Sequence, residues 1–307
     1  MTAFLVVIVL FGALVSPEFV SNSVYNTIVI CIKTIVPALF IYMVLTDYLV
    51  RKNVFRPVER ILEPLGCSIG IGGAGVTVFL LGLLCGFPIG AKLSTALSEQ
   101  NRISKKSAEY LNLFSNNCSL AFIFGVTSRI VGINGAWIIF LSQFFSAVII
   151  AVVFRIILSI KKEQPSIILM AADTNSYEFT SSVVNNGITM LNICASVIVF
   201  AFFGDIVAAI IPDTIIPVKG IFEFSSGVIQ CKSLDNNAAL FATTLFCCFG
   251  GIAVYGQVAS ITRGKLSNRL YVPAKMLQAV IGCFIAWLLI ICNEFFEEVN
   301  IVRILFH

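Results

Sequence analysis

The chain has 307 residues, of which 58% are hydrophobic and only 12% are charged, with a formal net charge of +4 and a mean hydropathy of +0.98. A soluble globular chain carries about 25% charged residues because water must solvate its surface. The composition therefore excludes a water-soluble domain and predicts an integral membrane protein. The charge is spread over short loops and forms no basic stripe between aromatics, so we expect no nucleic-acid partner.

The spacing of the ten cysteines and the position of the single histidine limit the metal, redox and nucleophilic chemistry that the chain can support. No two cysteines show the C-x-x-C spacing of zinc and redox sites. The histidine is His307, the last residue, so a nucleophile paired with a histidine base is not expected. We predict no metal ion, no cofactor and no enzymatic activity.

Six apolar segments approach or exceed the roughly 20 residues that a membrane helix needs. They cover residues 3–16, 26–50, 107–130, 136–160, 182–211 and 274–292. The first segment has the length of a signal peptide, but it lacks a positively charged start and a small-residue cleavage site. We therefore expect it to form an N-terminal membrane helix within residues 1–20.

Two further apolar segments, residues 69–98 and 238–262, are interrupted by turn-forming residues. The interruptions are Gly86, Pro88 and Gly90 in the first segment and Gly250 and Gly251 in the second. Proline removes a helical hydrogen bond and glycine permits sharp turns. Backbone freed at membrane depth must be buried in protein or line a cavity. We predict two re-entrant helical hairpins; plain spanning helices packed through small residues are the alternative.

Basic residues cluster in four loops, and such clusters mark the cytoplasmic side of a membrane protein. Clusters at residues 51–60, 102–106 and 161–162 share one side if the first hairpin dips into the membrane and returns. A fourth cluster, at residues 263–275, falls on the opposite side if residues 238–262 also form a hairpin. The second hairpin and the cytoplasmic location of basic loops therefore give opposite sides for residues 263–275.

The two halves of the chain resemble each other in pattern. Residues 86–97 align with residues 251–262, which places Lys92 opposite Gln257. An odd number of crossings separates the two units, so the second unit is inverted in the membrane. Inverted repeats with interrupted segments at matching positions are typical of secondary transporters. We predict repeat units over residues 21–165 and 166–307.

Three polar features stand out within apolar surroundings. Lys92 follows the first hairpin turn, where a lysine at membrane depth costs about 2.5–3.5 kcal/mol and usually has a partner or a task; snorkelling to an interface is the alternative. The polar run at residues 115–119 predicts either a break lining a cavity or hydrogen bonding between helices. Glu223, between Phe222 and Phe224, is either a coupling carboxylate or a loop residue.

Five motifs occur in order along the chain. They are ERILEPLG (59–66), GFPIGAK (86–92), LFSNN (113–117), FEFSSG (222–227) and FGGIAVYGQ (249–257). Together they resemble the YlbJ-type sporulation integral membrane proteins, also called stage V sporulation protein V. That family belongs to the Gate, or nucleoside-recognition, domain group and is distantly similar to concentrative nucleoside transporters. The sequence departs at Phe87, where tyrosine is expected, and at Cys118 and Ser119, which replace a less polar pair.

The resemblance implies two Gate-type repeats and transport of dipicolinic acid from the mother cell across the outer forespore membrane. The expected partners are a small-molecule anion and the lipid bilayer, and homo-oligomerisation is left open. A nucleoside or nucleobase transporter and a sporulation membrane assembly protein without transport are the alternatives. The candidate substrate-binding residues are Gly86, Pro88, Gly90, Lys92, Asn116, Asn117, Ser119, Glu223, Ser225, Gly227, Gly250, Gly251 and Gln257.

Overall fold

The computed structural model describes residues 14, 16–160, 177–211 and 217–305, and all regular structure in these residues is helical. Five helical runs among them are long and apolar enough to cross a membrane. They are Pro17–Arg51, Lys105–Ser159, Phe179–Ile210, Asn236–Thr262 and Tyr271–Cys292. The predicted all-α polytopic membrane fold is confirmed. The N-terminal helix expected over residues 3–16 lies almost entirely outside the described residues.

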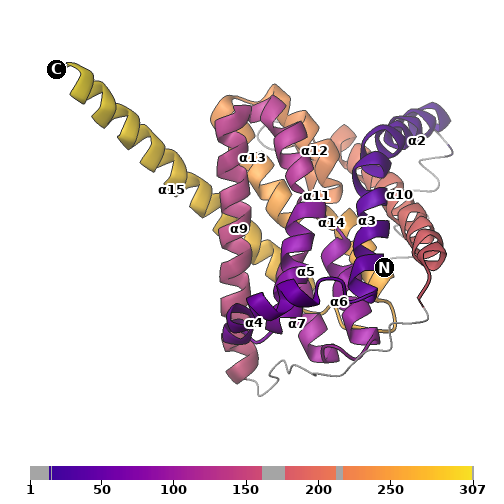
Figure 1. Ribbon diagram of the computed structural model, residues 1–307. Coiled ribbons are helices and arrows are strands. Elements are labelled where there is room, and N and C mark those ends of the chain that lie inside the picture. The colour runs from indigo at the N-terminus through magenta and orange to yellow at the C-terminus, as the bar shows by residue number, and fades with distance from the viewer. Residues whose placement is uncertain (1–13, 15, 161–176, 212–216, 306–307) are drawn as a thin grey trace.

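The first run forms one side of the bundle (Figure 1). It consists of α2 (Pro17–Ile30), the π-helical turn η1 (Cys31–Ile35) and α3 (Val36–Arg51). Pro17 stands at the first helical position, where its missing N–H removes no helical hydrogen bond. Both α2 and α3 pack along α10 (Phe179–Ile210).

Helix α4 (Arg56–Ile69) lies across the end of the bundle rather than along it, at 97° to the helix that follows. It exposes Val58, Ile61 and Leu65 while Glu59 is buried. The charged Arg56 and Arg60 are exposed as well, and a helix that exposes both apolar and charged side chains suits the membrane interface. We therefore place α4 at the boundary between membrane and water.

The hairpin predicted over residues 69–98 consists of α5 (Gly72–Cys85) and α6 (Ile89–Glu99). The chain folds back between them, so that a Cβ on Gly82 would lie 3.7 Å from the Cα of Gly90. Its two outer ends stay together, because Arg102 after α6 forms an ion pair with Glu59 of α4. The first hairpin therefore enters and leaves at one end of the molecule.

The second run crosses twice. Helix α7 (Lys105–Ser115) is interrupted before the short α8 (Leu120–Phe122) and the π-helical turn η2 (Ile123–Thr127). At Gly132, where φ is +74°, the chain reverses, and α9 (Ser128–Ile160) returns along η2 and α7. The separate spans predicted over residues 107–130 and 136–160 are confirmed.

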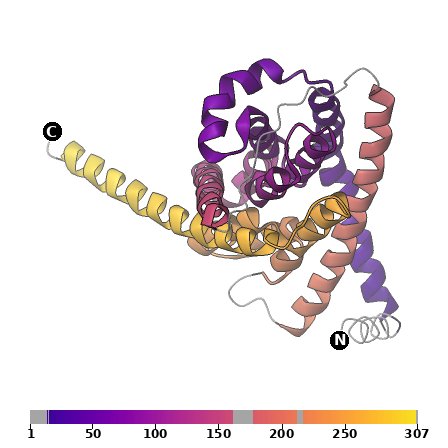
Figure 2. The same cartoon turned by 90° about the horizontal axis from the view of Figure 1, so that it is seen from below.

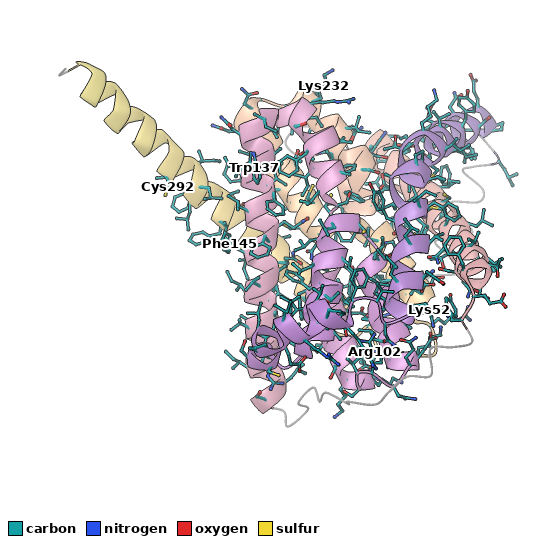
Figure 3. All side chains as sticks on the ribbon, viewed as in Figure 1. Lys52, Arg102, Trp137, Phe145, Lys232 and Cys292 are labelled. Atoms are coloured by element: carbon teal, nitrogen blue, oxygen red, sulfur yellow. The ribbon has the colours of Figure 1, made fainter. Side chains whose placement is uncertain are left out.

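A second, shorter hairpin follows α10. It consists of α11 (Lys219–Phe222) and α12 (Phe224–Gln230), and the 3-10 turn η3 (Cys231–Ser233) extends it. The chain folds back at Glu223, since a Cβ on Gly227 would lie 2.1 Å from the Cα of Gly220. Lys232, just after this hairpin, lies at the opposite end of the molecule from Lys52 and Arg102 (Figure 3).

The hairpin predicted over residues 238–262 is wrong. Helices α13 (Asn236–Phe249) and α14 (Gly251–Thr262) are separated only by Gly250, and together they form one run of 27 residues. The two glycines, both at positive φ, interrupt this span without reversing it. The last helix, α15 (Tyr271–Leu305), packs on α9 and α13 and then runs out from the bundle (Figures 1 and 2).

The conflict over the fourth basic loop disappears once α13 and α14 cross the membrane. Lys265, in the loop after α14, lies 2.6 Å from Glu99 at the end of α6. The N–H of Ser267 donates to Glu109 of α7 at 2.8 Å. The loops around residues 51–60, 102–106 and 263–269 therefore share one end of the molecule, called the basic end below. The cluster at residues 161–162 lies outside the described residues.

One order of elements occurs twice along the described residues. Each time, a hairpin precedes an interrupted helix: α5 and α6 before α7 and η2, then α11 and α12 before α13 and α14. The expected alignment of residues 86–97 with 251–262 is therefore wrong, because it matches a hairpin arm with half of a crossing helix. The unit boundaries at residues 21–165 and 166–307 stay a prediction.

Candidate functional site

Glycines let the first hairpin approach the interruption in α7. A Cβ on Gly82 or Gly90 would lie 2.0 Å or 2.4 Å from the carbonyl oxygen of Ser115, well inside van der Waals contact. The N–H of Ala91 donates to the side-chain oxygen of Asn116 at 2.8 Å. The hairpin tip and the interruption therefore form one unit.

The backbone freed at this interruption is satisfied by α9. The amide of Gln143 accepts from the N–H of Cys118 at 2.9 Å and donates to its carbonyl oxygen at 3.0 Å. Both residues are buried, and two unpaired backbone groups would be costly at membrane depth. The sequence pattern does not predict a role for Gln143, because a single glutamine in an apolar helix carries no pattern of its own.

Asn116 and Asn117 connect this interruption to the last helix by hydrogen bonds. The carbonyl oxygen of Asn116 accepts from the ammonium of Lys275 at 2.7 Å, and the side-chain oxygen of Asn117 accepts from Gln278 at 2.9 Å. Lys275 and Gln278 belong to α15. Lys275 belongs by sequence to the basic cluster at residues 263–275, but its side chain is buried inside the bundle.

Glu223 caps the start of α12. One carboxylate oxygen accepts from the N–H of Ser225 at 3.1 Å and from its hydroxyl at 2.7 Å, and the other accepts from the N–H of Ser226 at 2.7 Å. A carboxylate at this position satisfies amides that the helix leaves unpaired. Glu223 is 1% exposed, so it is a buried helix cap as well as a cavity residue.

A cavity of about 110 Å³ lies between the tips of the two hairpins. Its polar lining is sparse, with Thr34, Ser119, Glu223, Ser225 and Gln257 among mostly apolar side chains. Three phenylalanines surround the tips: the ring centroid of Phe224 lies 5.4 Å from that of Phe87 and 5.1 Å from that of Phe122. We call this space the central cavity.

A second cavity, of about 420 Å³, lies toward the basic end. Its charged lining consists of Asp47, Arg51, Lys92, Glu99 and Lys265. Three cations thus face two carboxylates, so the space carries a net positive charge. We call it the vestibule.

Lys92 differs from the other two vestibule cations. Arg51 and Lys265 form ion pairs with acids of the lining. The ammonium of Lys92 donates to the hydroxyl of Thr189 at 3.1 Å, and no carboxylate of the described residues lies within 4 Å of it. An ammonium has three donors, so Lys92 keeps capacity for an anion.

The two cavities share three elements of their lining, α3, α10 and α14. Helix α10 contributes Asn192 to the vestibule and the next residue, Ile193, to the central cavity. Helix α14 contributes Ser260 to the first and Gln257 to the second. On α3 the buried Met43 lies between the two linings. A solute that enters at the basic end would meet the vestibule first and the hairpin tips next.

The structure brings together part of the predicted site. Gly86, Ser119, Glu223, Ser225 and Gln257 line the central cavity. Lys92 lines the vestibule instead, so it lies in a different space from Glu223. The remaining seven predicted residues line neither space and belong to the hairpins and interruptions around it: Pro88, Gly90, Asn116, Asn117, Gly227, Gly250 and Gly251.

Comparison with known proteins gives one partial match. The chain is 34% identical over 97 residues to the sporulation integral membrane protein YlbJ of Bacillus subtilis (strain 168), a match that covers 31% of this chain and 24% of that protein. The match therefore spans about a quarter of the length of its relative. No family model and no solved structure matches the chain. The protein is an integral membrane protein related to a sporulation integral membrane protein.

Proposed function

We propose that the chain is a membrane transporter of small aromatic anions. Its substrate is dipicolinic acid, which it carries across the outer forespore membrane during sporulation. The observation that supports this most is the alignment of a net-positive vestibule with an aromatic central cavity. Dipicolinic acid combines two carboxylates with a flat ring, and each property suits one of the two spaces.

The vestibule attracts and orients the anion. Lys92 supplies a point charge to one carboxylate, in a setting where water no longer screens the interaction fully. Arg51 and Lys265 add positive charge, although Asp47 and Glu99 already compensate much of it. The substrate therefore binds through Lys92 before it advances toward the hairpin tips.

The central cavity accepts the ring. Phe87, Phe122 and Phe224 present apolar surface there, and aromatic rings favour offset or edge-to-face contact. The neutral hydrogen-bonding groups in the same lining include Gln257, Ser119, Ser225 and Thr34. Movement of the two hairpins, which enter from opposite ends, would open this cavity to each side in turn.

A nucleoside substrate finds less support. Recognition of a sugar and base would require free amides. Asn116 and Asn117 use theirs within the fold, which leaves Gln257 as the amide in the central cavity. The uncharged nucleoside would also gain nothing from the positive vestibule. We therefore use it as the competing substrate in the test.

The proposal is tested with the purified protein in liposomes. Labelled dipicolinate and labelled uridine are offered separately, with protein-free liposomes as the control. We expect saturable uptake of dipicolinate and none of uridine above the control. Uptake of uridine without dipicolinate would replace this proposal by the nucleoside function, and uptake of neither would favour the assembly protein.

A further inference from the structure

The ammonium of Lys275 is buried at the junction of three elements. Lys275 belongs to α15, is 1% exposed, and donates to the carbonyl oxygen of Asn116 at 2.7 Å and to Gln278 at 2.6 Å. It also lies 5.4 Å from the ring centroid of Phe87 at the tip of the first hairpin. One charge thus contacts α15, the α7 interruption and the hairpin tip.

No carboxylate of the described residues lies within 4 Å of this ammonium. Its compensation comes from the end of α7 instead. The last carbonyl groups of a helix lack helical partners and carry a partial negative charge. Asn116 directly follows the last residue of α7 and caps its end, so Lys275 sits where that partial charge is concentrated. The ring face of Phe87 adds a further favourable contact for a cation.

The ends of interrupted helices are the places where membrane transporters bind cations from solution. Here the chain supplies the cation itself. We propose that Lys275 is a resident cation that holds the α7 interruption against the tip of the first hairpin, and that this position therefore needs no alkali cation. The inference concerns the scaffold and does not depend on which substrate is transported.

The matched substitutions are Lys275→Ala and Lys275→Met. Both remove the charge, but alanine also leaves a space beside the carbonyl oxygen of Asn116 and the side-chain oxygen of Gln278. A small cation can enter that space, whereas the methionine side chain fills it. A merely structural role in packing would make methionine the better substitute under all ionic conditions.

The test measures the midpoint of thermal unfolding of the purified protein in detergent, in choline chloride, sodium chloride and methylammonium chloride. The wild-type midpoint is expected to be equal in all three salts. Lys275→Ala is expected to unfold at a lower temperature in choline and to recover by about 2–4 °C in sodium or methylammonium, since a ligand that binds only the folded state stabilises it. Lys275→Met is expected to be destabilised without recovery.

Two results would overturn the inference. In the first, sodium raises the unfolding midpoint of the wild-type protein relative to choline, which would show that a free cation binds despite the lysine. This measurement needs no substituted protein. A Lys275→Met protein as stable as the wild type would show that the charge is not needed. If Lys275→Ala fails to fold in choline, folding restored by methylammonium supports the inference, and failure in every salt contradicts it.

Discussion

Arg102 and Glu59 form a buried ion pair that joins the far end of the first hairpin to the interfacial helix before it. The hairpin lies between these two residues in the sequence, so both of its ends are held at one side of the bundle. Lys265 joins the same end through Glu99. Three loops that are distant in sequence thus meet there.

This arrangement predicts which residues can be labelled from one side. In a variant without native cysteines, single cysteines at Arg60, Asn101 and Ser267 should all react with an impermeant thiol reagent applied from the same side of the membrane. A cysteine at Lys232 should react only from the other side, because it lies at the opposite end (Figure 3).

Labelling of positions 60 and 101 from opposite sides would contradict the re-entrant hairpin. Labelling of position 267 from the side of position 232 would instead show that α13 and α14 do not cross. One set of labelled proteins therefore tests the first hairpin and the crossing of α13 and α14 separately.

Gly227→Ala tests the close packing of the second hairpin. A Cβ there would lie 2.1 Å from the Cα of Gly220, and backbone cannot move aside easily. We expect a loss of about 1–3 kcal/mol in stability, the usual cost of overpacking, seen as a lower unfolding temperature in detergent.

Gly187→Ala is the matched control, since nothing lies within 4 Å of its added Cβ and alanine favours a helix by up to about 1 kcal/mol. We expect unchanged or raised stability. Equal destabilisation by the two substitutions would contradict the close contact between α11 and α12.

Glu223→Gln tests the carboxylate that caps α12 inside the central cavity. A glutamine retains one acceptor oxygen, so one of the two capped N–H groups loses its partner. Caps contribute about 0.5–2 kcal/mol, and here the loss also displaces groups that line the cavity. We expect lower stability together with reduced dipicolinate uptake.

Asp235→Asn is the control for a cap away from the cavity. Asp235 accepts from the N–H of Ala238 at 3.3 Å at the exposed start of α13. The Asp235→Asn protein should lose as much stability as Glu223→Gln or less, and it should keep full dipicolinate uptake. Unchanged uptake in Glu223→Gln would reduce Glu223 to a structural cap.

Lys92→Met tests the anion site of the vestibule. A charge-assisted hydrogen bond contributes about 1.5–3 kcal/mol, so the KM for dipicolinate should rise by about tenfold or more. Lys92→Arg should be intermediate, because a planar fork replaces a point charge poorly. The exposed Lys105 lies at the same end outside the vestibule, and Lys105→Met should leave the KM unchanged. A KM raised equally by both methionine variants would reduce Lys92 to a general surface charge.

Hydropathy predicted the crossing helices well, because a span of apolar residues has few alternatives in a membrane. It also found the first hairpin, whose turn contains both proline and glycine. It misplaced the second hairpin, since α11 and α12 are only 4 and 7 residues long and fall below the length that hydropathy resolves. Gly250 and Gly251 are residues typical of a turn, but in the structure they interrupt a membrane span without reversing the chain.

The candidate site was predicted in part for a similar reason. Glu223 and Gln257 stand out as isolated polar residues in apolar sequence, and both line the central cavity. Lys275 stands next to a basic loop, so its position on the buried face of α15 depends on tertiary packing that the sequence pattern does not contain. The ion pairs of Arg51 and Lys265, which leave Lys92 as the available cation, likewise depend on the fold.

Protection from thiol modification by the substrate tests the proposed path most directly. Single cysteines are placed at Asn192 in the vestibule and at Ala38 in the central cavity, with Leu191, which is 72% exposed on the outer face of α10, as the control. We expect dipicolinate to slow the modification of positions 192 and 38 by a small thiol reagent. Uridine should not slow it, and position 191 should be unaffected by either compound. Modification of positions 192 and 38 at the same rate with and without saturating dipicolinate would contradict a substrate path through the two cavities.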